Sequence, residues 1–265
     1  MKFKVTLECL GNYKILPINY QYPLSAAIYK IIDHADKEYA EFLHQEGYGK
    51  GYKFFTFSDL NAKFNIQKDR MLLQFPIVSF FINFHLPEAS QHFIKGLFQS
   101  RKITIADKIS KVTFEVKNIE ALKDPLKEHK ANEIIEVNCK PLSPIVCGVK
   151  NDHNNYNFLN PNDEQFIDSF TYNWRQKIEA NYDLQTAEDA LLLTEIDFYK
   201  NNKARSRLIT IKAGTPAETK IRGFLNFKLN LKAEKRFIEI LQNCGAGLYN
   251  AQGMGFLQPI KTNVL

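Results

Sequence analysis

The order of the predicted strands and helices occurs twice in this chain, and this repetition limits the fold more than any other feature. Residues 1–120 read as strand, helix, strand, strand, helix, strand, and residues 133–265 follow the same order. Apolar residues at three- and four-residue spacing indicate the helices, and short alternating or apolar runs indicate the strands. The repetition therefore predicts two α+β units of one plan, each with its own sheet.

In the first unit, the strands come from one alternating segment and several short apolar runs. They are predicted at residues 2–9, 52–57, 71–84, 103–105 and 112–116. One helix carries an apolar stripe from Leu24 to Ile32, and a second covers residues 87–98.

In the second unit, the strands are longer and a glycine-rich segment comes before the last one. They are predicted at residues 134–139, at 191–199 together with 208–211, at 221–229 and after the glycines. Helices are predicted at residues 163–182 and 233–243. The single Trp174 lies on the apolar face of the first of these helices, which favours a place in the core over a platform for stacking on bases.

These orders predict an α+β fold of two tandem ferredoxin-like (βαββαβ) domains, at residues 1–120 and 133–265. The connecting segment, residues 118–132, is charged, contains Pro125 and lacks periodicity. A length of 265 residues suits two domains, and an apolar content of 45% is enough for two cores. Sheets of this kind are a common platform for RNA.

The composition excludes several classes of protein. There is no run of about 18 apolar residues, and the alternating first segment lacks the apolar block of a secretory signal. We therefore expect a cytoplasmic protein with no membrane partner. The four cysteines lack the paired spacing of a zinc site, and the six histidines form no ligand-spaced cluster. We expect reduced thiols, no metal and no cofactor.

A basic segment lies in the second unit. Nine Lys or Arg residues fall between Lys200 and Lys232, where Glu218 is the only acid, and Lys235 follows as a tenth base. Although the net charge of the chain is only +6, this segment predicts a positive surface that attracts polyanions. The alternative is the solvated face of a long hairpin.

A glycine-rich segment follows the last predicted helix. It contains four of the twelve glycines, namely Gly245, Gly247, Gly253 and Gly255. Glycine suits positive φ and close approach of a ligand to the main chain, so the segment predicts a surface for a bulky anion; a tight turn without a ligand is the alternative. A phosphate loop is excluded because no Lys-Ser or Lys-Thr follows the glycines. A dinucleotide-binding fingerprint is excluded as well, because it would follow a strand and begin a helix, whereas here a predicted helix comes before the glycines and a strand after them.

The glycine spacing resembles the carboxy-terminal signature of the CRISPR-associated endoribonucleases of family six, which is Gly-apolar-Gly, five residues, Gly-apolar-Gly. Here the five residues, 248–252, lack the Lys or Arg that the family usually carries. Further motifs of this family resemble Ile28-Tyr29, Leu43-His44, Lys53 before Phe54-Phe55-Thr56-Phe57-Ser58, and Leu142-Ser143-Pro144-Ile145-Val146. Proteins of this family are built from two paired ferredoxin-like domains, which is the fold expected for this chain.

The resemblance implies an enzyme that cuts the CRISPR repeat in a precursor transcript and releases guide RNAs. The implied reaction needs no metal: the ribose 2′-oxygen attacks the adjacent phosphate and leaves a cyclic phosphate and a free 5′-hydroxyl. The implied catalytic residues are His44 as acid or base, Lys53 as a cation near the phosphate and Tyr29 as an orienting hydroxyl. The residues assigned to RNA binding are Lys50, Lys203, Arg205, Arg207, Arg222, Gly245, Gly247, Gly253 and Gly255.

Two other functions stay open. Members of the same superfamily without a working histidine hold guide RNA as structural subunits, and a general RNA-binding protein would show no preference for a repeat. Other subunits of a CRISPR complex and a second copy of the chain are possible partners.

The three catalytic candidates meet only if the chain bends between them. Tyr29 and His44 are fifteen residues apart, so one straight helix would separate them by about 22 Å. Asp36 is a good N-cap for a second helix, and Gly47 can end it. Folding back would bring His44 beside Tyr29, while the glycines that follow let the loop deliver Lys53. Two other histidines, His34 and His85, lie outside the matched motif.

Overall fold

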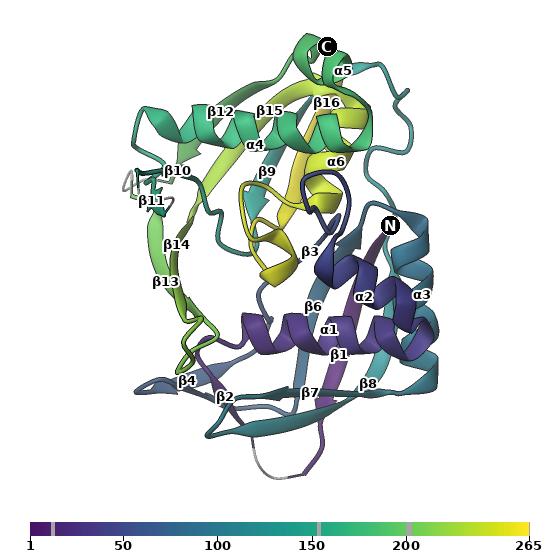
Figure 1. The fold of residues 1–265 in the computed structure, drawn as a ribbon, viewed down its shortest axis with the longest axis vertical. Helices are drawn as coiled ribbons and strands as arrows, with labels where there is room; N and C mark the ends of the chain where they lie inside the picture. The colour runs from purple at the N-terminus through teal and green to yellow at the C-terminus, as the bar shows by residue number, and fades with distance from the viewer. Residues whose placement is uncertain (12–13, 153–154, 200–202, 265) are drawn as a thin grey trace.

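The computed structural model describes residues 1–11, 14–152, 155–199 and 203–264. Figure 1 shows the two halves of the chain one above the other, each with helices packed over a sheet. No helix in these ranges is long and apolar enough to cross a membrane.

The sheet of the first half is antiparallel, with the chain's first strand in its interior. Alternate residues of that strand are buried, as the alternating sequence predicts. In spatial order the strands are β3 (Phe55–Phe57), β6 (Ile77–Phe84), β1 (Lys2–Cys9), β8 (Lys111–Ala121) and β7 (Lys102–Ala106). The helices of this half are α1 (Gln21–Ala35), α2 (Lys37–Gln45) and α3 (Pro87–Gln99).

The sheet of the second half repeats this arrangement. Its strands, in spatial order, are β12 (Leu193–Phe198), β15 (Phe227–Glu234), β9 (Ile134–Pro141) and β16 (Leu257–Val264). Its helices are α4 (Gln165–Asn181), α5 (Leu184–Asp189) and α6 (Lys235–Cys244). In the first sheet β1 lies between β6 and β8, with β3 beside β6. In the second sheet β9 lies between β15 and β16, with β12 beside β15, so the two orders agree apart from the extra edge strand β7 of the first sheet. This common order confirms the two ferredoxin-like units.

The core of the second half forms beneath α4. Phe166, Phe170, Trp174 and Ile178, spaced four residues apart, are fully buried. The indole Nε1 of Trp174 donates a 2.9 Å hydrogen bond to the main-chain oxygen of Phe237. Trp174 is therefore a core residue, as predicted, and offers no surface to a base.

Several elements differ from the sequence prediction. The run 71–84 forms two strands, β5 (Arg70–Leu73) and β6. Pro76 lies just before β6 and has no amide hydrogen to donate to a neighbouring strand. The predicted linker begins too early, because β8 pairs with β1 as far as Ala121. The domain limits at residues 120 and 133 stay a prediction. Elements that the pattern missed are β2 (Ile15–Pro17), β4 (Phe64–Gln67), β10 (Gly148–Lys150), β11 (Tyr156–Phe158), the short helix α5 and the 3-10 helix η1 (Asn250–Gln252).

The two long strands predicted around the basic segment each divide in two. Their outer parts form a separate two-stranded ribbon, β13 (Arg205–Ile211) and β14 (Thr219–Leu225), while β12 and β15 stay in the sheet. Asn226, at a φ of 69°, turns the chain between β14 and β15. Figure 1 shows the ribbon running down beside the first half. At its tip, the Nζ atom of Lys108 donates a 2.8 Å hydrogen bond to the oxygen of Gly214.

Candidate active site

A sharp corner between α1 and α2 brings His44 back toward α1. Asp36 is extended, with a φ of −158°, and its carboxylate accepts a 2.9 Å hydrogen bond from the amide of Tyr39. At the other end of α2, Gly47 has a φ of 68° and its amide bonds to the oxygen of Phe42. The helix break that the sequence predicts at these residues is confirmed.

The corner places the rings of Tyr29 and His44 in contact. Their centroids are 5.3 Å apart and the rings meet edge to face. Phe55 of β3 meets Tyr29 in the same manner at 5.6 Å. Burial raises the pKa of the Tyr29 phenol, so its hydroxyl stays protonated and able to donate. His44 itself is exposed in the last turn of α2.

Lys53 joins this pair through the main chain. Its Nζ atom donates a 3.0 Å hydrogen bond to the main-chain oxygen of His44, which leaves two N–H donors for another group. Partial burial lowers the pKa of Lys53. A Cβ atom on Gly47 would lie 3.0 Å from the Nζ and Cδ atoms of Lys53 and 2.6 Å from the oxygen of Tyr52. Glycine at position 47 therefore makes room for the lysine.

The loop that carries Lys53 is anchored in the second half of the molecule. Phe54, at a φ of 51°, is buried in the core of that half and stacks on Tyr48 and Tyr52. The ammonium of Lys50 lies 2.5 Å from Oε1 of Gln176 and 3.2 Å from Oε2 of Glu179, both on α4. Lys50, predicted to bind RNA, thus already has protein partners, although its side chain is exposed.

The glycine-rich segment is closed by contacts within the protein. All four glycines have positive φ and all are buried. The nearest atom to a Cβ added at each would belong to the Asn250 side chain for Gly245, the Val146 oxygen for Gly247, the Phe57 ring for Gly253 and the Ala246 oxygen for Gly255. The interpretation that the glycines admit a ligand therefore needs correction, because the close approach is between protein atoms. The residues left partly exposed are 248–252.

Both halves hold the glycine-rich segment. From the first half, Ser25 Oγ donates a 2.6 Å hydrogen bond to the oxygen of Ala251, and Thr56 Oγ1 donates one of 3.0 Å to the oxygen of Met254. Within the segment, the side-chain Nδ2 atom of Asn250 donates hydrogen bonds to the oxygens of Ala246 and Met254. These bonds give residues 248–252 a defined conformation.

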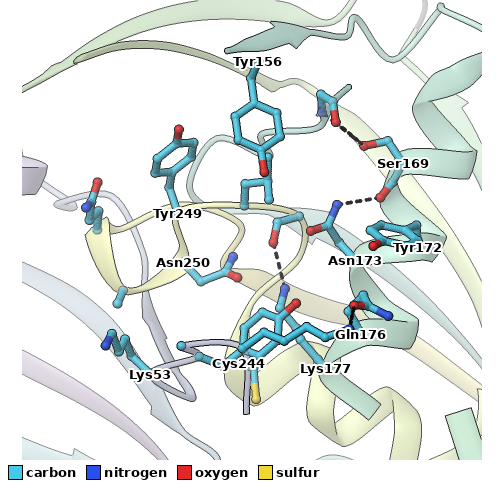
Figure 2. A pocket seen from close by; sticks show the side chains of 18 of the residues that line it. Lys53, Tyr156, Ser169, Tyr172, Asn173, Gln176, Lys177, Cys244, Tyr249 and Asn250 are labelled. Carbon is cyan, nitrogen blue, oxygen red and sulfur yellow. Dashed lines mark hydrogen bonds between the residues drawn. The ribbon is translucent and has the colours of Figure 1, made fainter. Parts of the chain in front are cut away.

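Lys177 is a residue that the sequence analysis missed. It is buried on α4, and its Nζ atom donates hydrogen bonds of 2.7 Å and 2.8 Å to the oxygens of Gly245 and Gly247. Figure 2 shows Lys177 among the residues of the pocket. Burial lowers its pKa to about 8, although the thiols of Cys244 and Cys147 act in the opposite direction. The signal in the sequence was a lysine beside Trp174 and Ile178 on the apolar face of a helix.

A cleft of about 960 Å³ lies between the two halves. As Figure 2 shows, the cleft is lined by the loop that carries Lys53, by α4, by the β10–β11 hairpin and by the glycine-rich segment. Lys53 forms part of its wall, so the cleft connects with the group formed by Tyr29, His44 and Lys53. Four tyrosines also line the cleft, namely Tyr52, Tyr156, Tyr172 and Tyr249.

The basic residues of the ribbon do not form one cluster. Lys203 and Arg205 are exposed, but Arg207 is paired with Asp59 of the first half at 2.7 Å. Arg222 pairs in register with Leu208, so strand alternation places it on the opposite face from Arg205 and Arg207. These residues therefore lie on one ribbon but do not share one face, and their role in RNA binding stays a prediction. Lys200, counted in the basic segment, lies outside the described residues.

Two other histidines, His85 and His34, have other surroundings than His44. The Nε2 atom of His85 is 3.0 Å from Oδ1 of Asn181, and burial lowers the pKa of His85. His34 is exposed at the end of α1. Within the described ranges, no three His, Cys, Asp or Glu side chains are grouped as metal ligands.

Comparisons of the sequence with known proteins agree on one family. Residues 15–120 match the family model "CRISPR-associated protein Cas6, N-terminal", and residues 125–259 match "CRISPR associated protein Cas6, C-terminal". A relative from Methanocaldococcus jannaschii, named CRISPR-associated endoribonuclease Cas6 1, is 30% identical over 183 residues, which are 69% of this chain and 67% of that protein.

Solved structures share the fold over nearly the whole chain. A Cas6-related protein from Pyrococcus furiosus has a TM-score of 0.79 at 21% identity, with 98% of each chain covered. A RAMP protein described as binding different RNA substrates has a TM-score of 0.77 at 20% identity, covering 98% of this chain and 100% of the other. The tandem ferredoxin-like architecture and the two matching models together show that this chain belongs to the Cas6 family of CRISPR-associated proteins.

Proposed function

We propose that this protein is an endoribonuclease that cuts CRISPR repeat RNA in a precursor transcript by attack of a ribose 2′-oxygen, without a metal ion. Membership of the Cas6 family and the relative named as a CRISPR-associated endoribonuclease support the activity and the substrate class. The observation that carries the proposed site is the meeting of three groups from separate elements. Tyr29 contacts the ring of His44, and Lys53 bonds to the main chain of the same histidine.

Each group suits one part of the reaction. The 2′-oxygen forms a bond to phosphorus while the bond from phosphorus to the 5′-oxygen breaks, so one proton leaves the nucleophile and one reaches the leaving oxygen. The exposed imidazole of His44 is the group that takes or gives a proton. The Lys53 ammonium, with two free donors, stabilises negative charge on the non-bridging oxygens. The protonated hydroxyl of Tyr29 orients the phosphate or the nucleophile.

The test uses repeat RNA with one 2′-deoxyribose immediately 5′ of the cut. Cleavage should stop at that position, because the attacking oxygen is missing, and binding of the RNA should persist. Cleavage of the unmodified RNA should continue in excess chelator. A metal-dependent nuclease that activates water would tolerate the deoxy substitution and lose activity in chelator. That second pattern would overturn the mechanism even if CRISPR repeats were the substrate.

The same assay separates the enzyme from the alternative, a subunit that holds guide RNA without cutting it. Such a protein would bind a repeat RNA and leave it intact under all of these conditions. A panel of repeats, rather than one, guards against choosing a sequence that the protein does not recognise.

A further inference from the structure

The cleft between the two halves has a chemical character that the proposed reaction does not use. Besides four tyrosines, it is lined by Lys53 and Lys150, by Lys50, which is paired with Glu179 of α4, and by the buried Lys177, which bonds to two main-chain oxygens; Asp168 is the only acid among its described lining residues. An excess of cations in a concave site attracts anions. Aromatic rings combined with such cations are typical of surfaces that bind unpaired nucleotides.

The tyrosines come from different elements and surround the same space. Tyr156 of β11 and Tyr249 of the glycine-rich segment are neighbours, with ring centroids 6.5 Å apart. Figure 2 shows these two rings on one side of the drawn cleft and Tyr172 of α4 on the other. Tyr172 is 63% exposed although it belongs to the lining. A large exposed ring facing a basic cleft is available for stacking on a ligand.

Two further details support a ligand that stacks and carries phosphate. The Nζ atom of Lys150 lies over the Tyr156 ring, 6.0 Å from its centroid, so a cation is within reach of the phosphate of a nucleotide held at this ring. Tyr249 has a φ of 59°, a strained conformation for a residue with a side chain, which the bonds of the glycine-rich segment maintain.

We propose that Tyr156, Tyr172 and Tyr249 form a stacking platform that holds unpaired nucleotides of the RNA in this cleft, with Lys150 beside their phosphates. The volume of about 960 Å³ lies at the upper end of the range of about 300–1,000 Å³ that is typical of small-ligand sites, which suits single nucleotides better than a duplex. The inference rests on the proposed function only in taking the ligand to be RNA. It assigns substrate positioning to residues outside both the basic ribbon and the group around His44.

The experiment measures binding in a His44→Ala background, so that the RNA stays intact. The probe is a single-stranded RNA of about ten nucleotides that contains a fluorescent adenine analogue whose emission falls on stacking. Tyr156→Ala and Tyr172→Ala should each weaken binding by about tenfold and restore the emission of the bound probe. Tyr156→Phe and Tyr172→Phe keep the ring and should retain affinity and quenching. An RNA duplex of the same length should compete poorly.

Tyr199→Ala is the matched control. Tyr199 is 41% exposed and has the Nζ atom of Lys228 5.3 Å from its ring centroid, but it lies outside the cleft lining. This variant should bind as the parent does. The platform is refuted if the Ala variants in the cleft bind and quench as the parent does, or if the Phe variants lose as much as the Ala variants. Because cutting is absent from the assay, these results are independent of whether the wild-type protein cleaves the repeat.

Discussion

The Nζ atom of Lys53 lies 3.0 Å from the main-chain oxygen of His44 and makes no hydrogen bond to the imidazole. The position of this cation therefore depends on the end of α2 and on the loop, while the imidazole is left to the solvent and to Tyr29. A substitution of the His44 side chain removes the ring and leaves the lysine in place.

From this geometry we expect His44→Ala to slow cleavage by about 10²-fold or more, as for the loss of a general acid or base, with RNA affinity near that of the wild type. Single-turnover cleavage and binding by anisotropy measure the two quantities. His34→Ala, at an exposed histidine on α1, should change neither. An equal loss of affinity in His44→Ala would argue against a chemical role.

Gly47→Ala tests whether the path of the loop positions Lys53. The added Cβ would lie 2.6 Å from the main-chain oxygen of Tyr52 and 3.0 Å from the ammonium of Lys53, so the loop must shift, and we expect slower cleavage by about tenfold or more through displacement of the cation. The control is Gly11→Ala, where φ is also positive, at 80°, and no atom lies within 4 Å of the new Cβ. Both variants carry the strain of a left-handed alanine, about 1–2 kcal/mol. A similar loss of rate in both would mean that strain alone explains the effect.

The buried Lys177 should make stability depend on pH at alkaline values. Its pKa is about 8 in the folded protein and 10.5 in a solvated chain, so between these values the unfolded chain binds more protons. The free energy of unfolding should then rise with pH, by up to about 1.4 kcal/mol per unit in this interval. A neutral amine keeps two N–H donors, so both bonds to the glycine oxygens survive deprotonation.

Lys177→Met removes this titration and provides the measurement. Urea unfolding of both proteins from neutral pH to about pH 10 should show the wild type gaining stability relative to the variant as pH rises above about 8. Titratable groups that both proteins share contribute equally to the two free energies of unfolding, so they cancel in the difference. Parallel curves would show that burial does not lower the pKa of Lys177.

Arg205 and Arg207 should behave differently, although they lie on the same face of one strand. Arg205 is exposed, and if it meets a phosphate, Arg205→Ala should flatten the slope of log affinity against log salt by about one. Arg207 is paired with Asp59, so Arg207→Ala should leave the slope unchanged and lower the free energy of unfolding by about 1–2 kcal/mol. If only Arg207→Ala changed the salt slope, Arg207 rather than Arg205 would be the residue that meets a phosphate.

Local signals in the sequence predicted part of the site correctly. Asp36 and Gly47 mark the ends of α2 because a cap involves residues only a few positions apart, and from these ends the contact of His44 with Tyr29 could be expected. The catalytic roles of these residues stay a prediction. Lys177 was missed because its partners, the oxygens of Gly245 and Gly247, lie 68 and 70 residues away.

The sequence by itself determined the order of the main strands and helices of each unit, the doubled ferredoxin-like plan and the buried place of Trp174, because periodicity and capping act over a few residues. Only the tertiary structure decided which basic side chains have an acidic partner and which atoms pack against each glycine. Arg207 has a partner in the other half, and Gly253 is packed against Phe57. Such contacts join residues far apart in the chain, so burial, pairing and the shape of the cleft follow from how the two halves pack together.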